Sequence, residues 1–380
     1  MSLLLVMFMG QMQQWMWNNT IDNSIAQNTG HIQVTDTAYV DEAILDNSIS
    51  IDQVAIDSIL SLEEVRGVYP RINFGALASY NIQAKSVGVA GFTPSTDSSE
   101  LKLAKKLKKG ELLNDDDKSI LITTSMAAYF KVDVGDTLVL IGQGYQGMTA
   151  AGLYPIKGIV NYPAGPMSNI AFMAMKECQY FYAMEGRVTN VLINLHDNKD
   201  LFITYDQVKN IVTDPALVVR NWEEVNPGFK EGMEIDTASK NAMMSVLLVI
   251  VAFGIFGTIV MMFSERIMEF SILLSIGMRK QKILATTLIE IFMLTSLGVI
   301  ASWVIITPIL YYINQNPIPM GGGAEEAIEK YGFEAIMSVG LYPEVYISSA
   351  KTILTMTALM SIYLAVKILS LKPLSGTQKQ

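Results

Sequence analysis

The chain has 380 residues, of which 51% are hydrophobic and 17% are charged, and its formal net charge is −9 at pH 7. This balance argues against a nucleic-acid partner, because phosphate binding needs clustered Lys and Arg. Cys178 is the single cysteine, so no intrachain disulfide can form, and cysteine usage indicates no compartment.

The first residues, 1–17, are apolar at the start and are then diluted by glutamines. Ser2–Met9 is apolar, and Trp15 and Trp17 fit the aromatic belt at a membrane interface. The segment has neither the basic start nor the small-residue cleavage site of a signal peptide. We expect residues 1–17 to be the outer end of a transmembrane helix whose beginning is missing from this sequence. A loose hydrophobic terminus is the alternative.

Three further segments are long and apolar enough to cross a membrane. They cover residues 243–263, 285–313 and 347–368, and a span needs about 20 residues. Glu290 lies near the start of the second span, and Pro308 lies inside it, where a membrane helix tolerates proline. The sequence therefore predicts membrane helices 2, 3 and 4 after a truncated helix 1.

The distribution of basic residues predicts which side of the membrane each loop lies on. Segment 264–282 holds four Lys or Arg and tail 369–380 holds two, whereas loop 314–346 holds five glutamates and one lysine. The positive-inside rule places 264–282 and 369–380 in the cytoplasm. Loop 314–346 and the large domain 18–241 then lie outside. The large domain is thus predicted to be an insertion between helices 1 and 2.

The outside domain reads as a soluble α+β domain of about 220 residues, large enough to bury a core. Apolar residues at every second position predict strands, and apolar residues at every third or fourth position predict helices. Residues 142–147 match a dinucleotide-binding spacing only in part and are read as a hairpin loop. Strands are predicted at 31–34, 65–71, 86–92, 119–122, 138–141, 154–160 and 188–195, and helices at 51–60, 124–130 and 200–212.

Few residues in this domain are candidates for catalysis or metal binding. His31 and His196 are isolated in the sequence, and Cys178 is expected to pack at a helix start. Asp115–Asp117 reads as a solvated loop, because consecutive carboxylates cannot all point at one ion. Lys105–Lys109 reads as the solvated face of a helix, with contact to anionic lipid as the second reading. No nucleophile, base and orienting group can be assembled, so an enzyme is the weakest reading.

Segment 264–282 carries a charged start, an apolar middle and a basic end. Its residues Glu265-Arg266-x-x-Glu269-Phe270-Ser271-Ile272-Leu273-x-Ser275-Ile276-Gly277-Met278 resemble the cytoplasmic signature of FtsX-like (MacB/Lol-type) ABC transporter permeases. Residues 120–130, 134–137 and 156–160 resemble the periplasmic core domain of that family. Residues 221–227 are similar to its lipoprotein-releasing branch, and Glu290 fits an acidic position early in the next helix.

The resemblance implies a permease half in the bacterial cytoplasmic membrane, in contact with lipid. It implies a second permease, identical or homologous, and a separate ABC ATPase that binds ATP, so this chain needs no cofactor of its own. Segment 264–282 would be a coupling helix that lies on the membrane face and docks on the ATPase. The residues expected to act there are Glu265, Arg266 and Glu269 as polar contacts, Phe270, Leu273 and Leu274 as an apolar ridge, and Gly277 and Met278 at the helix end.

Several functions remain open from the sequence. The leading one is release of lipoprotein cargo from the membrane to a periplasmic carrier. In a second function within the same family, the outside domain drives an efflux adaptor, or it activates a cell-wall hydrolase as cell-division members do. A third is of another class, a membrane-anchored receptor or adhesion protein without an ATPase. The coupling segment also has a plainer reading, an amphipathic helix that rests on the lipid surface.

Overall fold

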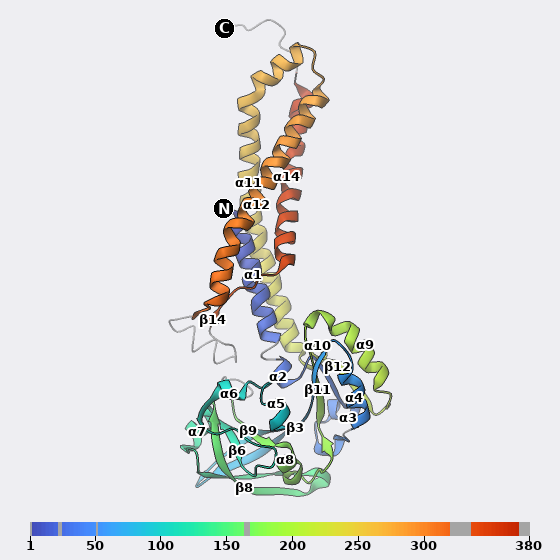
Figure 1. Ribbon diagram of the computed structural model, residues 1–380, viewed down its shortest axis with the longest axis vertical. Helices are drawn as coiled ribbons and strands as arrows, with labels where there is room; N and C mark the ends of the chain where they lie inside the picture. The colour runs from blue at the N-terminus through green and yellow to red at the C-terminus, as the bar shows by residue number, and fades with distance from the viewer. Residues whose placement is uncertain (1, 22–24, 51, 163–167, 320–335, 372–380) are drawn as a thin grey trace. The chain divides into compact units, whose positions relative to one another are not determined.

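The computed structural model describes residues 2–21, 25–50, 52–162, 168–319 and 336–371 (Figure 1). It divides into two units. The helical unit holds residues 1–17, 231–319 and 336–380, and the mixed unit holds 18–230 and 320–335. Much of the predicted loop 314–346 and of the tail 369–380 lies outside the described residues.

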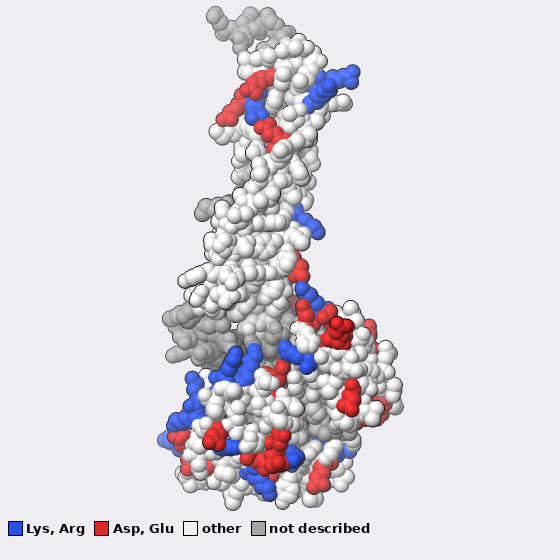
Figure 2. Space-filling view, viewed as in Figure 1, with Lys and Arg blue, Asp and Glu red and all other residues white. Residues whose placement is uncertain are grey.

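The helical unit contains four long helices that lie side by side (Figure 1). They are α1 (Ser2–Thr20), α11 (Pro227–Ser275), α12 (Lys280–Gln315) and α14 (Pro343–Ser370). Within the described part of the chain, α11, α12 and α14 have the length and hydropathy of membrane spans. Figure 2 shows charged side chains near one end of this unit and few along its middle, as lipid contact requires. A short strand pair, β13 (Ile318–Pro319) with β14 (Ile336–Met337), completes it.

Helix α1 packs into this bundle through its apolar residues. Leu3 and Met7 belong to one buried cluster with side chains of the three longer helices, namely Val251, Val299, Ile306, Leu310 and Ile353. Gln11 is fully buried. Its side-chain amide donates to the Tyr342 carbonyl oxygen at 3.0 Å and accepts from the Tyr342 amide at 2.8 Å. Residues 2–11 are therefore an integral helix of the bundle rather than a loose terminus.

The structure differs from the predicted boundary between the span 243–263 and a separate coupling helix 264–282. Helix α11 continues without a break from Pro227 to Ser275. Its 49 residues correspond to about 74 Å, against a hydrocarbon core of about 30 Å. No proline or glycine interrupts residues 258–276, so nothing in the sequence ends the helix at residue 263. The segment up to Ser275 thus continues the membrane helix and does not form a separate helix.

The mixed unit is built on a ten-stranded sheet in the order β12-β1-β11-β3-β4-β9-β6-β8-β5, with β7 paired to both β3 and β8. Strands β3, β4, β9, β6, β8 and β7 therefore close into a circuit. The strands are β1 (Ile32–Asp36), β2 (Ile49–Ser50), β3 (Val65–Tyr80), β4 (Gln83–Phe92), β5 (Leu107–Gly110), β6 (Ile120–Thr123), β7 (Thr137–Gln143), β8 (Thr149–Val160), β9 (Ile170–Ala174), β10 (Arg187–Val188), β11 (Asn190–Leu195) and β12 (Leu217–Asn221). Strands β2 and β10 form a separate pair.

Short helices cover parts of this sheet. They are α2 (Ala26–Asn28), α3 (Thr37–Asp41), α4 (Gln53–Leu60), α5 (Pro94–Asp97), α6 (Leu103–Lys106), α7 (Thr124–Phe130), α8 (Met175–Phe181), α9 (Leu201–Ile211) and α10 (Trp222–Val225). Single 3-10 turns lie at η2 (Leu45–Asn47), η3 (Tyr145–Gly147) and η4 (Asn198–Asp200). The predicted α+β class is confirmed, with helices and strands close to their predicted positions.

One local prediction is wrong. Lys105–Lys109 does not form one helix, because α6 ends at Lys106 and β5 begins at Leu107. Strand β5 pairs with β8, and Leu107 packs partly buried against the core cluster of Leu101, Leu103 and Phe172. Pairing with a distant strand therefore overrides the helix propensity of the lysines.

Candidate functional site

The end of α11 is closed by a glycine turn. The Met278 amide donates to the Leu273 carbonyl oxygen at 3.0 Å, and the Gly277 amide donates to that of Leu274 at 3.1 Å. This pair of bonds is a Schellman motif, with Gly277 at a φ of +100°. Gly277 therefore lies in the turn that closes the C-terminal end of α11. Helix α12 begins two residues after Met278, at Lys280.

The side chains around this turn face in two directions. Phe270 is buried, with only 6% of its surface exposed, and it packs with Phe263, Ile283, Leu364 and Ile368. Leu273 and Leu274 are partly buried against the same cluster. The predicted apolar ridge of Phe270, Leu273 and Leu274 therefore points into the bundle, and this assignment of the exposed face is wrong.

A different set of side chains faces outward. Ile276 is 79% exposed, and Met268 and Ile272 are about half exposed. Glu265 and Glu269, which were predicted to make polar contacts, lie exposed on the same part of the helix. We call Glu265, Met268, Glu269, Ile272 and Ile276 the α11 outer face. Residues spaced by three or four positions share one side of a helix, so these side chains form one stripe.

Arg266 and Glu290 join α11 to α12. The Arg266 Nη1 atom lies 2.5 Å from the Glu290 Oε2 atom. The Lys280 ammonium group in turn donates to the Leu369 carbonyl oxygen at 2.8 Å and so joins the start of α12 to the end of α14. A cation near a helix C-terminus also interacts favourably with the helix dipole. The predicted acidic position Glu290 is thus a partner of Arg266 in this structure.

Residues 221–227 form the connection between β12 and α11. Asn221 and Glu224 make a reciprocal capping box, at 2.9 Å and 3.1 Å. The Trp222 amide donates to the His31 carbonyl oxygen at 2.9 Å, and the Asn226 side chain donates to the Thr29 hydroxyl at 3.0 Å. The chain enters the domain near Thr29 and leaves it near Asn226, so these two connections are bonded to each other.

The three consecutive aspartates bind different partners. Asp115 accepts from the Ser95 amide at 2.9 Å, Asp116 pairs with Lys176, and Asp117 pairs with Lys157, each at 2.6 Å. The carboxylates therefore do not converge on one point. In the part of the chain that the structure describes, no cluster of three or more His, Cys, Asp or Glu side chains could hold a metal ion.

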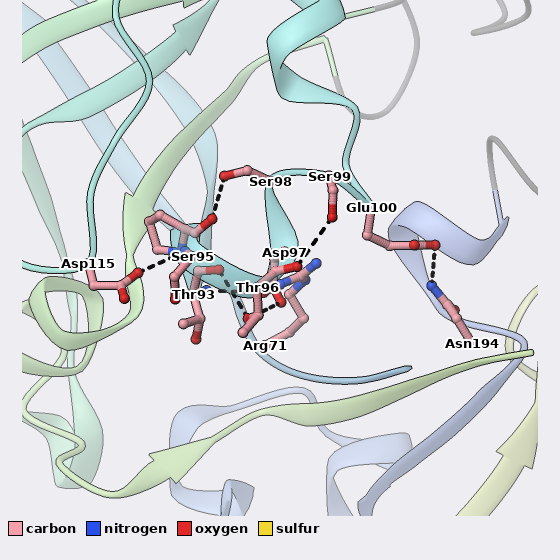
Figure 3. Close-up of polar contacts among 11 residues, drawn as sticks. Arg71, Thr93, Ser95, Thr96, Asp97, Ser98, Ser99, Glu100, Asp115 and Asn194 are labelled. Atoms are coloured by element: carbon pink, nitrogen blue, oxygen red, sulfur yellow. Dashed lines mark hydrogen bonds and ion pairs between the residues drawn. The ribbon is translucent and has the colours of Figure 1, made fainter. Parts of the chain in front are cut away.

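Segment 93–100 takes part in a buried polar network (Figure 3). Asp97 pairs with Arg71, and both side chains are almost fully buried. Asp97 also accepts from the Thr93 amide at 3.0 Å and from the Thr96 hydroxyl at 2.8 Å. Glu100 accepts from the Asn194 side chain at 2.7 Å. Each carboxylate is satisfied within the protein, so the network fixes the loop between β4 and β5 rather than offering a catalytic group.

Two of the three isolated candidates, Cys178 and His31, are buried packing residues. Cys178 is fully buried against β4, and burial raises the pKa of its thiol, which keeps it unreactive. His31 is fully buried immediately before β1, where its Nδ1 atom accepts from the Leu195 amide at 3.3 Å. Burial, followed by the positive charge of Arg66, lowers the pKa of His31 to about 4. His196 is exposed.

The apolar helices that are long enough to cross a membrane and the large mixed domain together define a membrane protein that carries a large folded domain. A family model described as the MacB-like periplasmic core domain matches residues 1–211, and one described as FtsX-like permease C-terminal matches residues 241–373. The chain belongs to the FtsX-like ABC transporter permeases that carry a MacB-like periplasmic core domain. The family predicted from the sequence is confirmed.

Solved structures give weaker likenesses. One is the extracellular domain of YknZ, a noncanonic ABC-type transporter from Gram-positive bacteria, with 13% identity over 50% of this chain and 99% of that chain and a TM-score of 0.36. Another is the periplasmic region of MacB from Actinobacillus actinomycetemcomitans, with 11% identity over 56% of this chain and 98% of that chain and a TM-score of 0.38. No curated protein matched the chain significantly.

Proposed function

We propose that this chain receives ATP-driven motion from a separate ABC ATPase at the α11 outer face. The observation that carries the proposal is an exposed apolar stripe, Met268, Ile272 and Ile276, on the last turns of a membrane helix. Glu265 and Glu269 flank it and supply charge contacts. An amphipathic helix that lays such a face into a groove is a common docking mode.

Helix α11 supplies the path for that motion. The proposed docking face and the connection at Pro227 lie on one uninterrupted helix, so movement at one end is carried along a single hydrogen-bonded rod. At the other end, the Trp222 amide and the Asn226 side chain hold the connection to Thr29–His31. A displacement of α11 would therefore act on β12 and β1 together, because these strands are paired.

For the setting, we propose the bacterial cytoplasmic membrane, with the α11 outer face in the cytoplasm and the mixed domain outside. The basic residues Arg266, Arg279, Lys280 and Lys282 around the turn support this orientation. A second permease, identical or homologous, would complete the transporter. With four membrane helices in each half, α1 would be the first.

For the cargo, we propose lipoproteins that are released from the membrane to a soluble carrier. Support comes from the similarity of residues 221–227 to the lipoprotein-releasing branch. The test is release of palmitate-labelled lipoproteins from spheroplasts after depletion of this chain. Retention in the membrane, restored by the intact chain, is the expected result. Unchanged release would contradict the proposed cargo while leaving ATPase docking untouched.

The docking proposal is tested with Ile272→Asp and Ile276→Asp in the full chain, by pull-down of the ATPase from membranes. We expect binding to fall by about tenfold or more, because a carboxylate would be buried without a partner. Ile203→Asp is the matched control, since Ile203 is 62% exposed on α9 of the mixed unit. Phe270→Asp is unsuitable, because Phe270 is buried in the bundle. Unchanged ATPase binding by both variants would refute docking at this face.

A further inference from the structure

The ten-stranded sheet ends in two edge strands that differ in character. Its strand order begins at β12 and finishes at β5. Strand β5 carries Lys108 and Lys109, both exposed, and lysines on an edge disfavour pairing with a further strand. Strand β12 reads Leu217-Val218-Val219-Arg220-Asn221, with two β-branched valines and a single charge. The edge at β12 therefore lacks the protection that lysines give to β5.

The register with β1 determines which backbone groups of β12 face its free edge. The Trp222 amide donates to the His31 carbonyl oxygen at 2.9 Å and continues the register of this strand pair. Residues 220 and 218 therefore also bond to β1, because every second residue does so in an antiparallel pair. The residues between them direct their N–H and C=O groups away from β1, and these are Leu217, Val219 and Asn221.

The outward backbone groups of β12 are only partly satisfied. The Asn221 amide donates to the Glu224 carboxylate at 3.1 Å, and the Val219 carbonyl oxygen accepts from the Tyr205 hydroxyl at 3.3 Å. The Val219 amide and the Leu217 carbonyl oxygen make no hydrogen bond within the described residues. Val219 is only 5% exposed. A buried backbone amide without an acceptor is costly, so this edge is suited to an additional backbone partner.

A groove of about 350 Å³ lies beside this edge, and we call it the β12 groove. Helix α3 contributes Val40 and Asp41 to its lining, α9 contributes Tyr205 and Lys209, and β12 contributes Val219 among others. All these residues belong to the mixed unit, in which Figure 1 shows β12 beside α9 and α10. An extended chain fits a groove of this kind, because its backbone groups repeat at the spacing of those on β12.

The charges at the β12 groove favour an acidic ligand. Lys209 and Arg220 have no carboxylate partner within the described residues: the Lys209 ammonium group lies 4.9 Å from the centre of the Tyr205 ring, and Arg220 donates to the Glu224 carbonyl oxygen at 2.5 Å. The Glu224 carboxylate already accepts a backbone amide in its capping box. Asp41 is the one lining carboxylate that makes no such bond in the described part of the chain. Two cations therefore stand against one available carboxylate.

We propose that the β12 groove binds an extended, acidic peptide segment of a partner protein, which adds to the sheet as a further strand beside β12. A carbonyl oxygen of the segment accepts from the Val219 amide, and an amide of the segment donates to the Leu217 carbonyl oxygen. These main-chain bonds supply affinity, and a carboxylate of the segment paired with Lys209 supplies selectivity. The site is separate from ATPase docking, because the groove belongs to the mixed unit and the α11 outer face to the helical unit.

The test uses the full chain in lipid nanodiscs, with a phage library of random nonapeptides as the probe. We expect the selected peptides to be rich in β-branched residues and to carry Asp or Glu. Val219→Pro should lower the affinity of the synthetic peptides by about tenfold or more, because proline removes the outward amide. An edge strand tolerates this proline, since that amide does not bond to β1. Val219→Ala keeps the amide and is the matched control.

A charge exchange tests the role of Lys209. Lys209→Glu should lower the affinity of the acidic peptides by about tenfold and favour peptides in which Lys replaces the acidic residue. Lys118→Glu is the matched control, because Lys118 is exposed and does not line the groove. Ile276→Asp should leave peptide binding unchanged, and Val219→Pro should leave the ATPase pull-down unchanged, so that failure of one site is distinguishable from failure of the other.

The proposal is overturned if selection on the intact chain yields no peptide that prefers it to a folded Val219→Pro variant, with folding checked by thermal unfolding. It is also overturned if selected peptides bind equally well after N-methylation of their backbone, since the groove would then be a pocket for side chains or small ligands. If Val219→Pro does not fold, N-methylated peptides and Lys209→Glu decide, and unchanged binding in both refutes strand addition.

Discussion

The Arg266 guanidinium group and the Glu290 carboxylate lie 2.5 Å apart and join the C-terminal part of α11 to α12. Both side chains are partly exposed, so the pair contributes at most about 1 kcal/mol to folding. Because the pair connects the two helices, we expect that it mainly makes α12 move together with α11 when the proposed docking face is displaced.

Reversal of either charge should therefore weaken coupling more than stability. We expect Arg266→Glu or Glu290→Arg to lower the stimulated hydrolysis rate of the partner ATPase about fivefold in reconstituted vesicles, equivalent to ~1 kcal/mol. The double reversal should recover most of the rate. Additive losses in the double variant would show that the two side chains act independently.

Substitution by alanine should change the free energy of unfolding differently at Gly277, in the turn that closes α11, and at Gly257, inside α11. The φ of +100° at Gly277 disfavours a side chain, so Gly277→Ala should lower the free energy of unfolding by about 1–2 kcal/mol. Gly257 lies inside α11 with open space around its Cα, so Gly257→Ala should be neutral or stabilising by up to about 1 kcal/mol. Thermal unfolding in detergent measures both, and equal shifts for the two variants would argue against a strained turn at Gly277.

His31 makes the stability of the mixed domain depend on pH. Its pKa is about 4 in the folded protein and 6.5 in the unfolded chain, so the unfolded state binds the extra proton between these values. Stability should therefore be full above pH 6.5 and fall by about 3 kcal/mol as the pH drops to 4. His31→Gln should flatten this dependence, measured by urea unfolding across pH, whereas His196→Gln should preserve it because that ring is exposed.

The buried pair Arg71–Asp97 should be sensitive to loss of one charge. Asp97→Asn leaves the buried guanidinium group without its countercharge, and we expect a loss of about 3–5 kcal/mol in unfolding free energy. Arg71→Met/Asp97→Asn should be more stable than the single variant, because no buried charge remains and Asn can still accept from the Thr93 amide. The exposed pair Lys176–Asp116 is the control, and Asp116→Asn should leave stability unchanged.

The sequence predicted the local elements well because each depends on near neighbours. The helix 124–130 has its predicted bounds, and each predicted span lies inside an observed helix, although α11 extends far beyond the span 243–263 at both ends. The closing of the strand circuit by β7 was not predictable, because it depends on pairings far apart in sequence. Strand β5 was also not predictable, because its lysines favour a helix and only the pairing with the distant strand β8 makes this segment a strand.

The orientation of the coupling segment was predicted incorrectly, but the signal was present. Ile259, Phe263 and Phe270 are spaced by four and seven residues, so they share one side of a continuous helix. The buried stripe of the span therefore extends to Phe270, and the phenyl rings of Phe263 and Phe270 lie 6.2 Å apart. When 264–282 is treated as a separate helix, its rotation relative to the span is undefined. The exposure of Ile272 and Ile276 then cannot be predicted.

The bond between Gln11 and Tyr342 has a consequence for sequence variation. The amide of Gln11 pairs with the backbone of Tyr342 and not with its phenol ring. Because both partner atoms belong to the backbone of residue 342, position 11 must supply a donor and an acceptor at the end of a long side chain. In a library of functional variants, position 11 should tolerate almost nothing but glutamine, and position 342 should exclude proline, because its backbone amide donates to Gln11.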